Sequence, residues 1–162
     1  MDWQSRLVFL PGVIVGLTVH EFSHALWAWI LGDNTAQKQG QVTLNPFKHI
    51  DLIGLFFIIF AGFGWAKAVE FNPEKLRNFQ RDRAIIAAAD PISNLLLGIL
   101  LVYIYDGRIS IPFVFNRDVL LSAALINFVL FVFNMLPIPP LDGSHIVFHG
   151  SILNQRPRLY LG

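Results

Sequence analysis

The chain has 162 residues, contains no cysteine and carries few charges. The absence of cysteine excludes a disulfide-linked scaffold. Asp, Glu, Lys and Arg make up 14% of the residues and 54% are apolar, whereas a soluble domain usually has about 25% charged residues. So few charges could not cover the apolar residues with a polar surface, and the composition also argues against disorder and a coiled coil. A polytopic membrane protein, surrounded by a lipid bilayer, is the class that remains.

Three apolar stretches are long enough to cross a bilayer, which takes about 20 apolar residues in a helix. They are residues 7–31, 84–105 and 118–141. A fourth stretch, residues 52–66, is shorter and contains glycines, so it is either a further span or a re-entrant or interfacial segment. We therefore predict an all-α polytopic membrane protein, with residues 1–162 forming a single membrane-embedded core. It has three to four transmembrane helices and a small polar loop region.

The distribution of Lys and Arg bears on topology, because cytoplasmic loops carry an excess of these residues. If residues 52–66 do not cross, 9 Lys and Arg lie on the side of residues 32–83 and 3 lie on the other side. With four full spans the numbers are 8 and 4, so both arrangements obey the rule. The three-span arrangement makes the first and last spans parallel, both ending in the cytoplasm. The net charge of +1 gives no electrostatic support for a nucleic-acid partner, and we expect none.

The first span contains ionisable residues, which are costly in a bilayer and mark functional sites. His20-Glu21-Phe22-Ser23-His24 is an HExxH motif. On a helix, residues four positions apart project from one face, so both imidazoles can reach one tetrahedral Zn²⁺ ion, with Glu21 beside it as general base. Two hydrogen-bonded histidines without a metal are the alternative. The glutamate between them, inside an apolar helix, favours the metal site.

A catalytic zinc site keeps three protein ligands, so a third residue must come from elsewhere in the chain. Charge balance favours a carboxylate, because Zn²⁺, two neutral imidazoles, ionised Glu21 and one ionised Asp sum to zero. Asp142 has the most suitable setting, since prolines end the preceding helix and Gly143 permits an unusual turn. The other candidates are Asp90, His145, His149, His49 and Asp51.

With these motifs the chain resembles the site-2 protease family of intramembrane zinc metalloproteases (M50 type), in its small form without a PDZ domain. One matching motif is HExxH within an apolar span. A second is NxxPxxxxDG near the end of a later span, formed by Asn134, Pro137, Asp142 and Gly143. The third is an intervening sequence like that of the small members, at residues 32–36, 43–51 and 63–67. The resemblance covers roughly residues 7–147.

The resemblance implies that His20, His24 and Asp142 bind one zinc ion per chain and that Glu21 is the catalytic base. It also implies a site inside the membrane, towards the cytoplasmic face. The substrate would then be a transmembrane or membrane-proximal helix of another membrane protein. We expect an integral protein of a prokaryotic cell membrane.

One position of the third span departs from the family pattern Gly-Pro-x-x-Asn. Asp90 replaces the glycine, and Asn94 is retained. We predict that Asn94 and Asn134 contact the substrate backbone or the developing oxyanion. Asp90 is an additional carboxylate near the expected site, and the sequence assigns it no role.

The sequence thus predicts a zinc-dependent metalloendopeptidase. The alternative is a catalytically inactive pseudoprotease or membrane adaptor that binds partner helices, against which the intact motif residues argue. A metal transporter would need acids and histidines across the whole bilayer, but the candidate ligands cluster at one depth. The sequence determines neither the substrate nor the oligomeric state.

Overall fold

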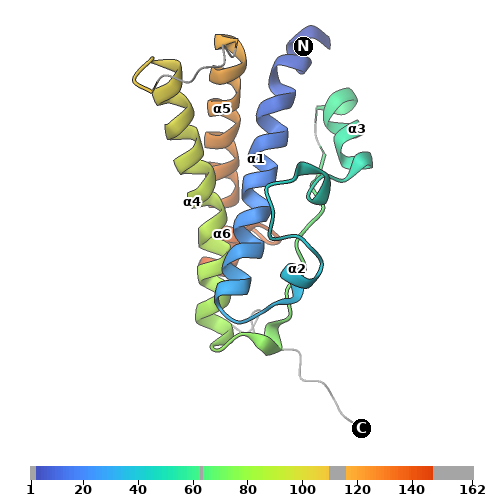
Figure 1. The fold of residues 1–162 in the computed structure, drawn as a ribbon, viewed down its shortest axis with the longest axis vertical. Coiled ribbons are helices and arrows are strands. Elements are labelled where there is room, and N and C mark those ends of the chain that lie inside the picture. Colours follow the sequence, from blue (N-terminus) through green and yellow to red (C-terminus); the bar gives the residue numbers. More distant parts are fainter. Residues whose placement is uncertain (1–2, 63, 110–115, 148–162) are drawn as a thin grey trace.

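Three long helices form the body of the protein (Figure 1). The computed structural model describes residues 3–62, 64–109 and 116–147. Within these residues the regular structure is helical apart from one isolated antiparallel bridge, between Ile50 and Ala66. The three helices long and apolar enough to cross a membrane confirm the predicted all-α polytopic membrane protein. They are α1 (Trp3–Ile30), α4 (Phe79–Tyr105) and α5 (Arg117–Asn134).

The long helices run in alternating directions, so that α1 and α5 are parallel and α4 is antiparallel to both (Figure 1). Their ends differ from the predicted spans for local reasons. α4 begins at Phe79 because the Asn78 side chain accepts from the Arg81 N–H while the Asp82 carboxylate accepts from the Asn78 N–H, a reciprocal N-terminal cap. α5 ends at Asn134, short of residue 141, because the prolines that follow cannot continue a helix.

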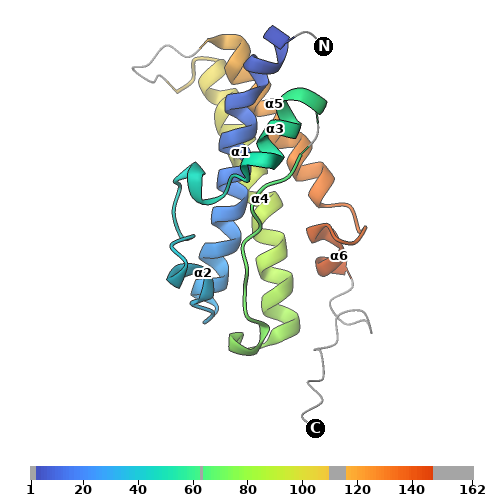
Figure 2. The same cartoon turned by 90° about the vertical axis from the view of Figure 1, so that its right-hand side faces the viewer.

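The polar loop region connects α1 to α4 and contains one short apolar helix, α3. At ten residues, α3 is about 15 Å long, half of the hydrocarbon thickness. Its N-terminus is capped by Asp51, and it ends at Gly62 with φ 81°. The chain rises to α3 and returns to the same end of the bundle before α4 begins (Figure 2). The short elements of this region are α2 (Thr35–Lys38), η1 (Pro46–Lys48), α3 (Leu52–Ala61) and η2 (Pro73–Lys75).

Glycines on α1 allow α5 to approach it closely. A Cβ atom on Gly12 would lie 2.6 Å from the Cα of Ala123, and one on Gly16 would lie 2.9 Å from Cδ1 of Leu130. Small residues four apart permit such backbone contact between membrane helices, where packing rather than the hydrophobic effect drives association. The close contact sets the position of the turn that follows α5.

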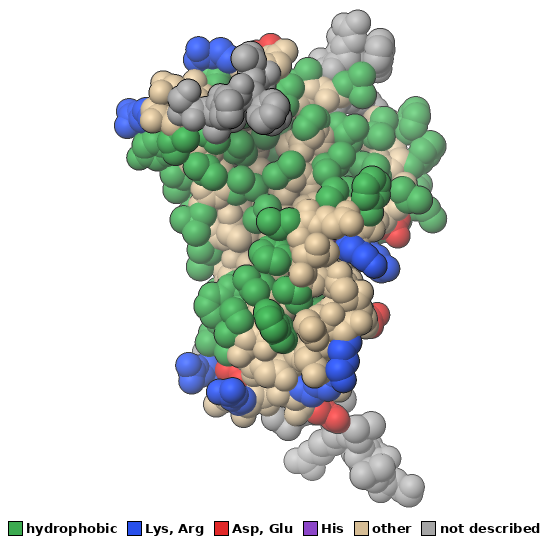
Figure 3. All heavy atoms as spheres, viewed as in Figure 1, with side chains coloured by type: hydrophobic (Ala, Val, Ile, Leu, Met, Phe, Trp, Pro, Cys, Tyr) green, Lys and Arg blue, Asp and Glu red, His purple; other side chains and the backbone are tan. Residues whose placement is uncertain are grey.

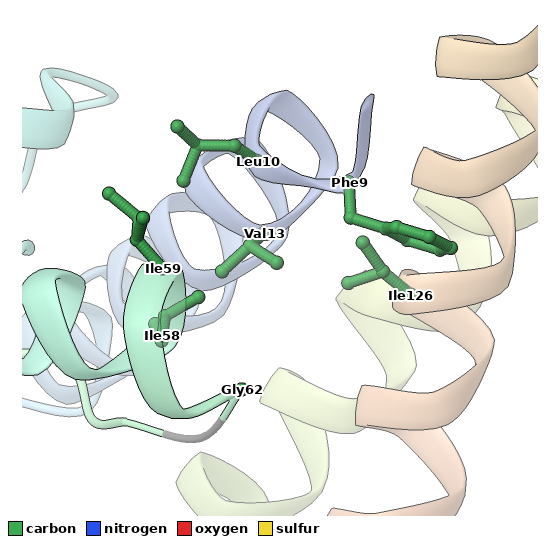
Figure 4. Close-up of a pocket in the computed structure, with 7 residues that line it drawn as sticks. All are labelled: Phe9, Leu10, Val13, Ile58, Ile59, Gly62 and Ile126. Carbon is green, nitrogen blue, oxygen red and sulfur yellow. The ribbon is translucent and has the colours of Figure 1, made fainter. Parts of the chain in front are cut away.

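The outer surface is apolar, as lipid contact requires. Val129 and Leu96 are 64% and 61% exposed. In Figure 3 apolar side chains cover much of the upper part of the bundle, and most Lys and Arg side chains lie towards its ends. An apolar pocket of about 340 Å³ lies between α1, α3 and α5 (Figure 4). It is lined by Phe9, Leu10, Val13, Ile58, Ile59, Gly62 and Ile126.

Candidate metal centre

The HExxH residues of α1 face the interior of the bundle. His20 and Glu21 are 7% and 8% exposed, and His24 is half-buried. The His20 and His24 rings meet edge to face, with centroids 5.5 Å apart. The helical spacing of four residues thus places both imidazoles on one face, as the sequence predicts.

Asp142 reaches this face from the first residue of α6 (Asp142–Val147). The chain turns sharply after α5, with the Leu141 N–H donating to Ile138 at 2.8 Å. A side chain on Gly143 would collide with the backbone carbonyls of Met135 and Leu136. The glycine therefore lets the turn fold back against the end of α5 and bring Asp142 to α1.

The distances around Asp142 fit a shared metal ion better than hydrogen bonds. Its Oδ2 lies 3.4 Å from Nε2 of His20, and its Oδ1 lies 3.4 Å from Nε2 of His24. Both distances exceed those of ordinary hydrogen bonds. Two ligands that each bind tetrahedral zinc at 2.0–2.1 Å are separated by about 3.3 Å. Two imidazoles and one carboxylate are also a donor set of catalytic zinc sites, so these residues fit Zn²⁺.

The other ring nitrogens of the two histidines are held by α4. Nδ1 of His20 donates to Oδ1 of Asn94 at 2.9 Å. Nδ1 of His24 lies 2.5 Å from Oδ2 of Asp90. Each Nε2 atom is therefore left to face Asp142, the arrangement that protein sites use to orient histidine ligands.

Glu21 is fixed by the loop that returns from α3. Its Oε2 accepts a hydrogen bond from the backbone N–H of Val69 at 3.0 Å. The neighbouring Lys67 N–H donates to the carbonyl of His49 at 2.7 Å. The glutamate of the motif thus has a defined position beside the histidine pair.

Neighbouring charges and burial shift the pKa values of the Asp142 and His145 side chains. Burial opposes ionisation of Asp142, but the adjacent imidazoles outweigh it and hold the pKa of this carboxyl well below its usual range. Burial and the Arg83 charge lower the pKa of His145 below its ordinary value. Nη2 of Arg83 lies 3.3 Å from Nε2 of His145. Because a guanidinium only donates, Nε2 is the acceptor and the proton of His145 is on Nδ1.

Apart from Asp90, the other candidates for the third ligand are engaged elsewhere or lie outside the described residues. Nε2 of His49 donates to the carbonyl of Thr43 at 2.7 Å, and Asp51 caps α3. His145 pairs with Arg83. His149 lies outside the described part of the chain. Asp90 lies beside Nδ1 of His24, and the ligand atoms of Asp90, Asp142 and the two histidines lie within 4.8 Å of one another.

The two predicted asparagine contacts have different surroundings. Asn94 is fully buried, and its amide donates to the carbonyl of Gly16 at 3.0 Å and to Oδ1 of Asn127 at 2.9 Å. Both N–H bonds of Asn94 are used, so in this arrangement it has no donor left for an oxyanion. Asn134 is half-buried and donates to the carbonyl of Leu130 at 3.0 Å. Its contact with substrate stays a prediction.

Sequence reasoning missed the roles of Asp90 and Asn127 in this network. A signal for Asp90 existed, because Asp90 and Asn94 are separated by one helical turn, like His20 and His24. The two pairs meet only because α1 and α4 are neighbours, which the sequence did not show.

Comparison with known proteins gives one family profile and several relatives. The profile of the family described as "Peptidase family M50" matches residues 111–158. A protein of Bacillus subtilis (strain 168) named "Putative zinc metalloprotease YwhC" is 39% identical over 142 residues, covering 83% of this chain and 65% of that protein. The chain is similar to the M50 (site-2 protease) family in this profile match and in this relative. No solved structure matches it.

Two mycobacterial relatives in the comparison carry the name "Putative zinc metalloprotease Rip2". The one from Mycolicibacterium smegmatis is 29% identical over 142 residues, and the one from Mycobacterium tuberculosis is 32% identical over 146 residues. Each alignment covers 85% of this chain and 54% of the relative. The chain therefore spans between about half and two thirds of the length of these relatives.

Proposed function

We propose that this chain is an intramembrane zinc endopeptidase that hydrolyses peptide bonds in or near transmembrane helices of other membrane proteins. The observation that carries the proposal is the convergence of two Nε2 atoms on Asp142 at 3.4 Å, with the motif glutamate fixed beside them. His20, His24 and Asp142 are the residues that would hold one Zn²⁺ per chain. A bound zinc would polarise the scissile carbonyl and make a water molecule more acidic.

Glu21 has the role of general base. One of its carboxylate oxygens accepts the Val69 N–H, and the other takes a proton from the attacking water. The water oxygen then bonds to the carbonyl carbon, the C–N bond breaks, and Glu21 passes the proton to the leaving amine. A substrate helix must unwind locally first, because its carbonyls are otherwise engaged in intrahelical hydrogen bonds.

The site is proposed to face the cytoplasmic side of a prokaryotic cell membrane. His24 lies six residues before the end of α1, or about 9 Å along the helix axis. The loop region at that end carries most of the Lys and Arg, and such loops lie in the cytoplasm. A site at this depth can receive water from the cytoplasm and a substrate helix from the bilayer.

The decisive experiment replaces the proposed base. In cells that co-express a membrane-protein reporter cut by the wild type, Glu21→Gln is expected to reduce cleavage at least 100-fold, because the amide cannot accept the water proton. Zinc content of the purified variant should equal that of the wild type. The matched control is Glu74→Gln, since Glu74 is exposed on η2. Cleavage by the Glu21 variant at the wild-type rate would refute the mechanism.

A further inference from the structure

We propose that Asp90 is a positioning residue for the metal centre, and that its carboxylate orients the His24 imidazole as the Asn94 amide orients that of His20. The inference rests on the proposed zinc site. It gives a role to a residue at which this chain departs from the glycine of the family pattern.

His24 contacts a carboxylate at each ring nitrogen, and the two distances differ. The longer one is expected between two ligands of the same metal ion, and the shorter one between the ring and an orienting group. Asp90 lies 2.5 Å from Nδ1, and Asp142 lies 3.4 Å from Nε2. Two ligands of one tetrahedral ion cannot approach to the shorter distance, since about 3.3 Å separates them. A charge-assisted contact between N–H and carboxylate is short. Asp90 therefore contacts the Nδ1 side of the ring as an ion-pair partner.

The geometry of the two helices makes this pairing specific. On α1 the histidines are one turn apart, and on α4 the two acceptors Asp90 and Asn94 are one turn apart. Because the helices are antiparallel, the earlier histidine meets the later acceptor and the later histidine meets the earlier one. One face of α4 thus holds both Nδ1 atoms and turns both Nε2 atoms towards Asp142.

The surroundings of Asp90 leave His24 as its partner. The carboxyl has no exposed surface and no hydrogen-bond partner among the described residues, so the ion-pair contact with His24 is the polar contact that the structure gives it. A buried carboxylate without compensation is strongly unfavourable. Its position against the imidazole offsets this cost. The carboxylate also makes the histidine a more basic ligand, which strengthens metal binding.

The test measures zinc affinity of the detergent-purified full chain by competition with a chelator. Asp90→Ala is expected to weaken zinc binding 10- to 100-fold, the usual effect of removing an orienting group. Asp90→Asn should recover most of the affinity, because the amide oxygen can still accept from Nδ1. The control is Asp82→Asn, a buried carboxylate at the start of the same helix, which should bind zinc as the wild type does.

Cobalt(II) as the probe metal distinguishes an orienting residue from a ligand. The Asp90→Ala protein, saturated with cobalt, should keep the d–d band positions of the wild type, whereas Asp142→Ala should shift or lose them. Unchanged zinc affinity in Asp90→Ala would overturn the proposal. Loss of zinc in both Asp90 variants together with shifted cobalt bands would overturn it too, by making Asp90 a ligand.

A second pair of variants, Asp90→Leu and Asp90→Asn, also tests the role of the carboxylate in zinc binding. If Asp90→Ala does not fold, Asp90→Leu fills the same space without an acceptor. Weaker zinc binding by the Leu variant than by Asp90→Asn supports the proposal, and equal binding by the two refutes it. Because zinc binding is measured without cleavage, an active Glu21→Gln variant would refute the proposed mechanism and leave this inference standing.

Discussion

Asp33 joins the end of α1 to the loop that precedes α4. Its side chain has no exposed surface and accepts hydrogen bonds from the N–H and the hydroxyl of Thr35 and from the N–H of Asn72. Lys75 lies 3.6 Å away. Burial alone would raise the pKa of Asp33, but these hydrogen bonds and the lysine outweigh it and lower that pKa below its ordinary value. The charged form of Asp33 therefore stabilises the loop region.

This shift predicts a pH dependence of stability. A carboxyl with a lowered pKa in the folded state contributes stability above its unfolded pKa, about 3.9, and this contribution is lost as the pH falls through the folded value. At pH 7, Asp33→Asn should lower the free energy of unfolding by roughly 1–3 kcal/mol. Thermal unfolding in detergent from pH 7 to pH 3 should show the difference from wild type shrinking below about pH 4.

The matched control for Asp33 is Asp106→Asn, because Asp106 is exposed after α4. Its unfolding curve should follow the wild type at each pH. A difference between Asp33→Asn and wild type that stays constant down to pH 3 would contradict the electrostatic explanation.

At the scale of helices, the contact between α1 and α5 determines where Asp142 lies relative to the histidine pair. Gly12→Val would place a side chain 2.6 Å from the Cα of Ala123 and so force the two helices apart. We expect it to lower the free energy of unfolding by about 1–3 kcal/mol, the usual cost of overpacking. It should also weaken zinc binding, although Gly12 is two turns from His20. Thermal unfolding and zinc competition measure the two effects.

Val15→Leu is the control for this helix contact. Val15 lies on the same helix and is 45% exposed on its outer side, so both measurements should be unchanged. If Gly12→Val bound zinc as tightly as the wild type, the spacing of α1 and α5 would not determine the site.

For the whole molecule, the absence of cysteine makes the orientation in the membrane directly measurable. Any single introduced cysteine is the unique thiol of the chain. Lys48→Cys marks the loop region, and Arg108→Cys marks the opposite end, after α4; both positions are exposed. In intact cells a membrane-impermeant maleimide should label only the Arg108→Cys protein, because the Lys-rich and Arg-rich end lies in the cytoplasm. Lys48→Cys should be labelled after permeabilisation. The reverse pattern would contradict a cytoplasmic site.

The sequence alone determined that this protein lies in a lipid bilayer. It also determined the arrangement of those metal-centre residues that are close together along the chain. The low charge and long apolar stretches indicated a bilayer, because such a chain cannot cover its apolar surface in water. The HExxH spacing placed His20 and His24 on one face, since helix periodicity is a local property. Proline and glycine near Asp142 indicated that the last span ends before this residue, although α5 ends at Asn134 and the predicted span ran to residue 141.

The tertiary structure decided what depends on residues distant in the chain. It brought Asp142 to both Nε2 atoms, whereas charge and spacing left His145 and other residues as alternatives. It also paired Asp90 with His24, because only the antiparallel contact of α1 and α4 aligns those turns. Short apolar α3 could be read from sequence as a span or as a re-entrant segment, and the return of the chain to one end of the bundle was visible only in three dimensions. Local periodicity fixes the face a side chain occupies, but helix packing determines what that face meets.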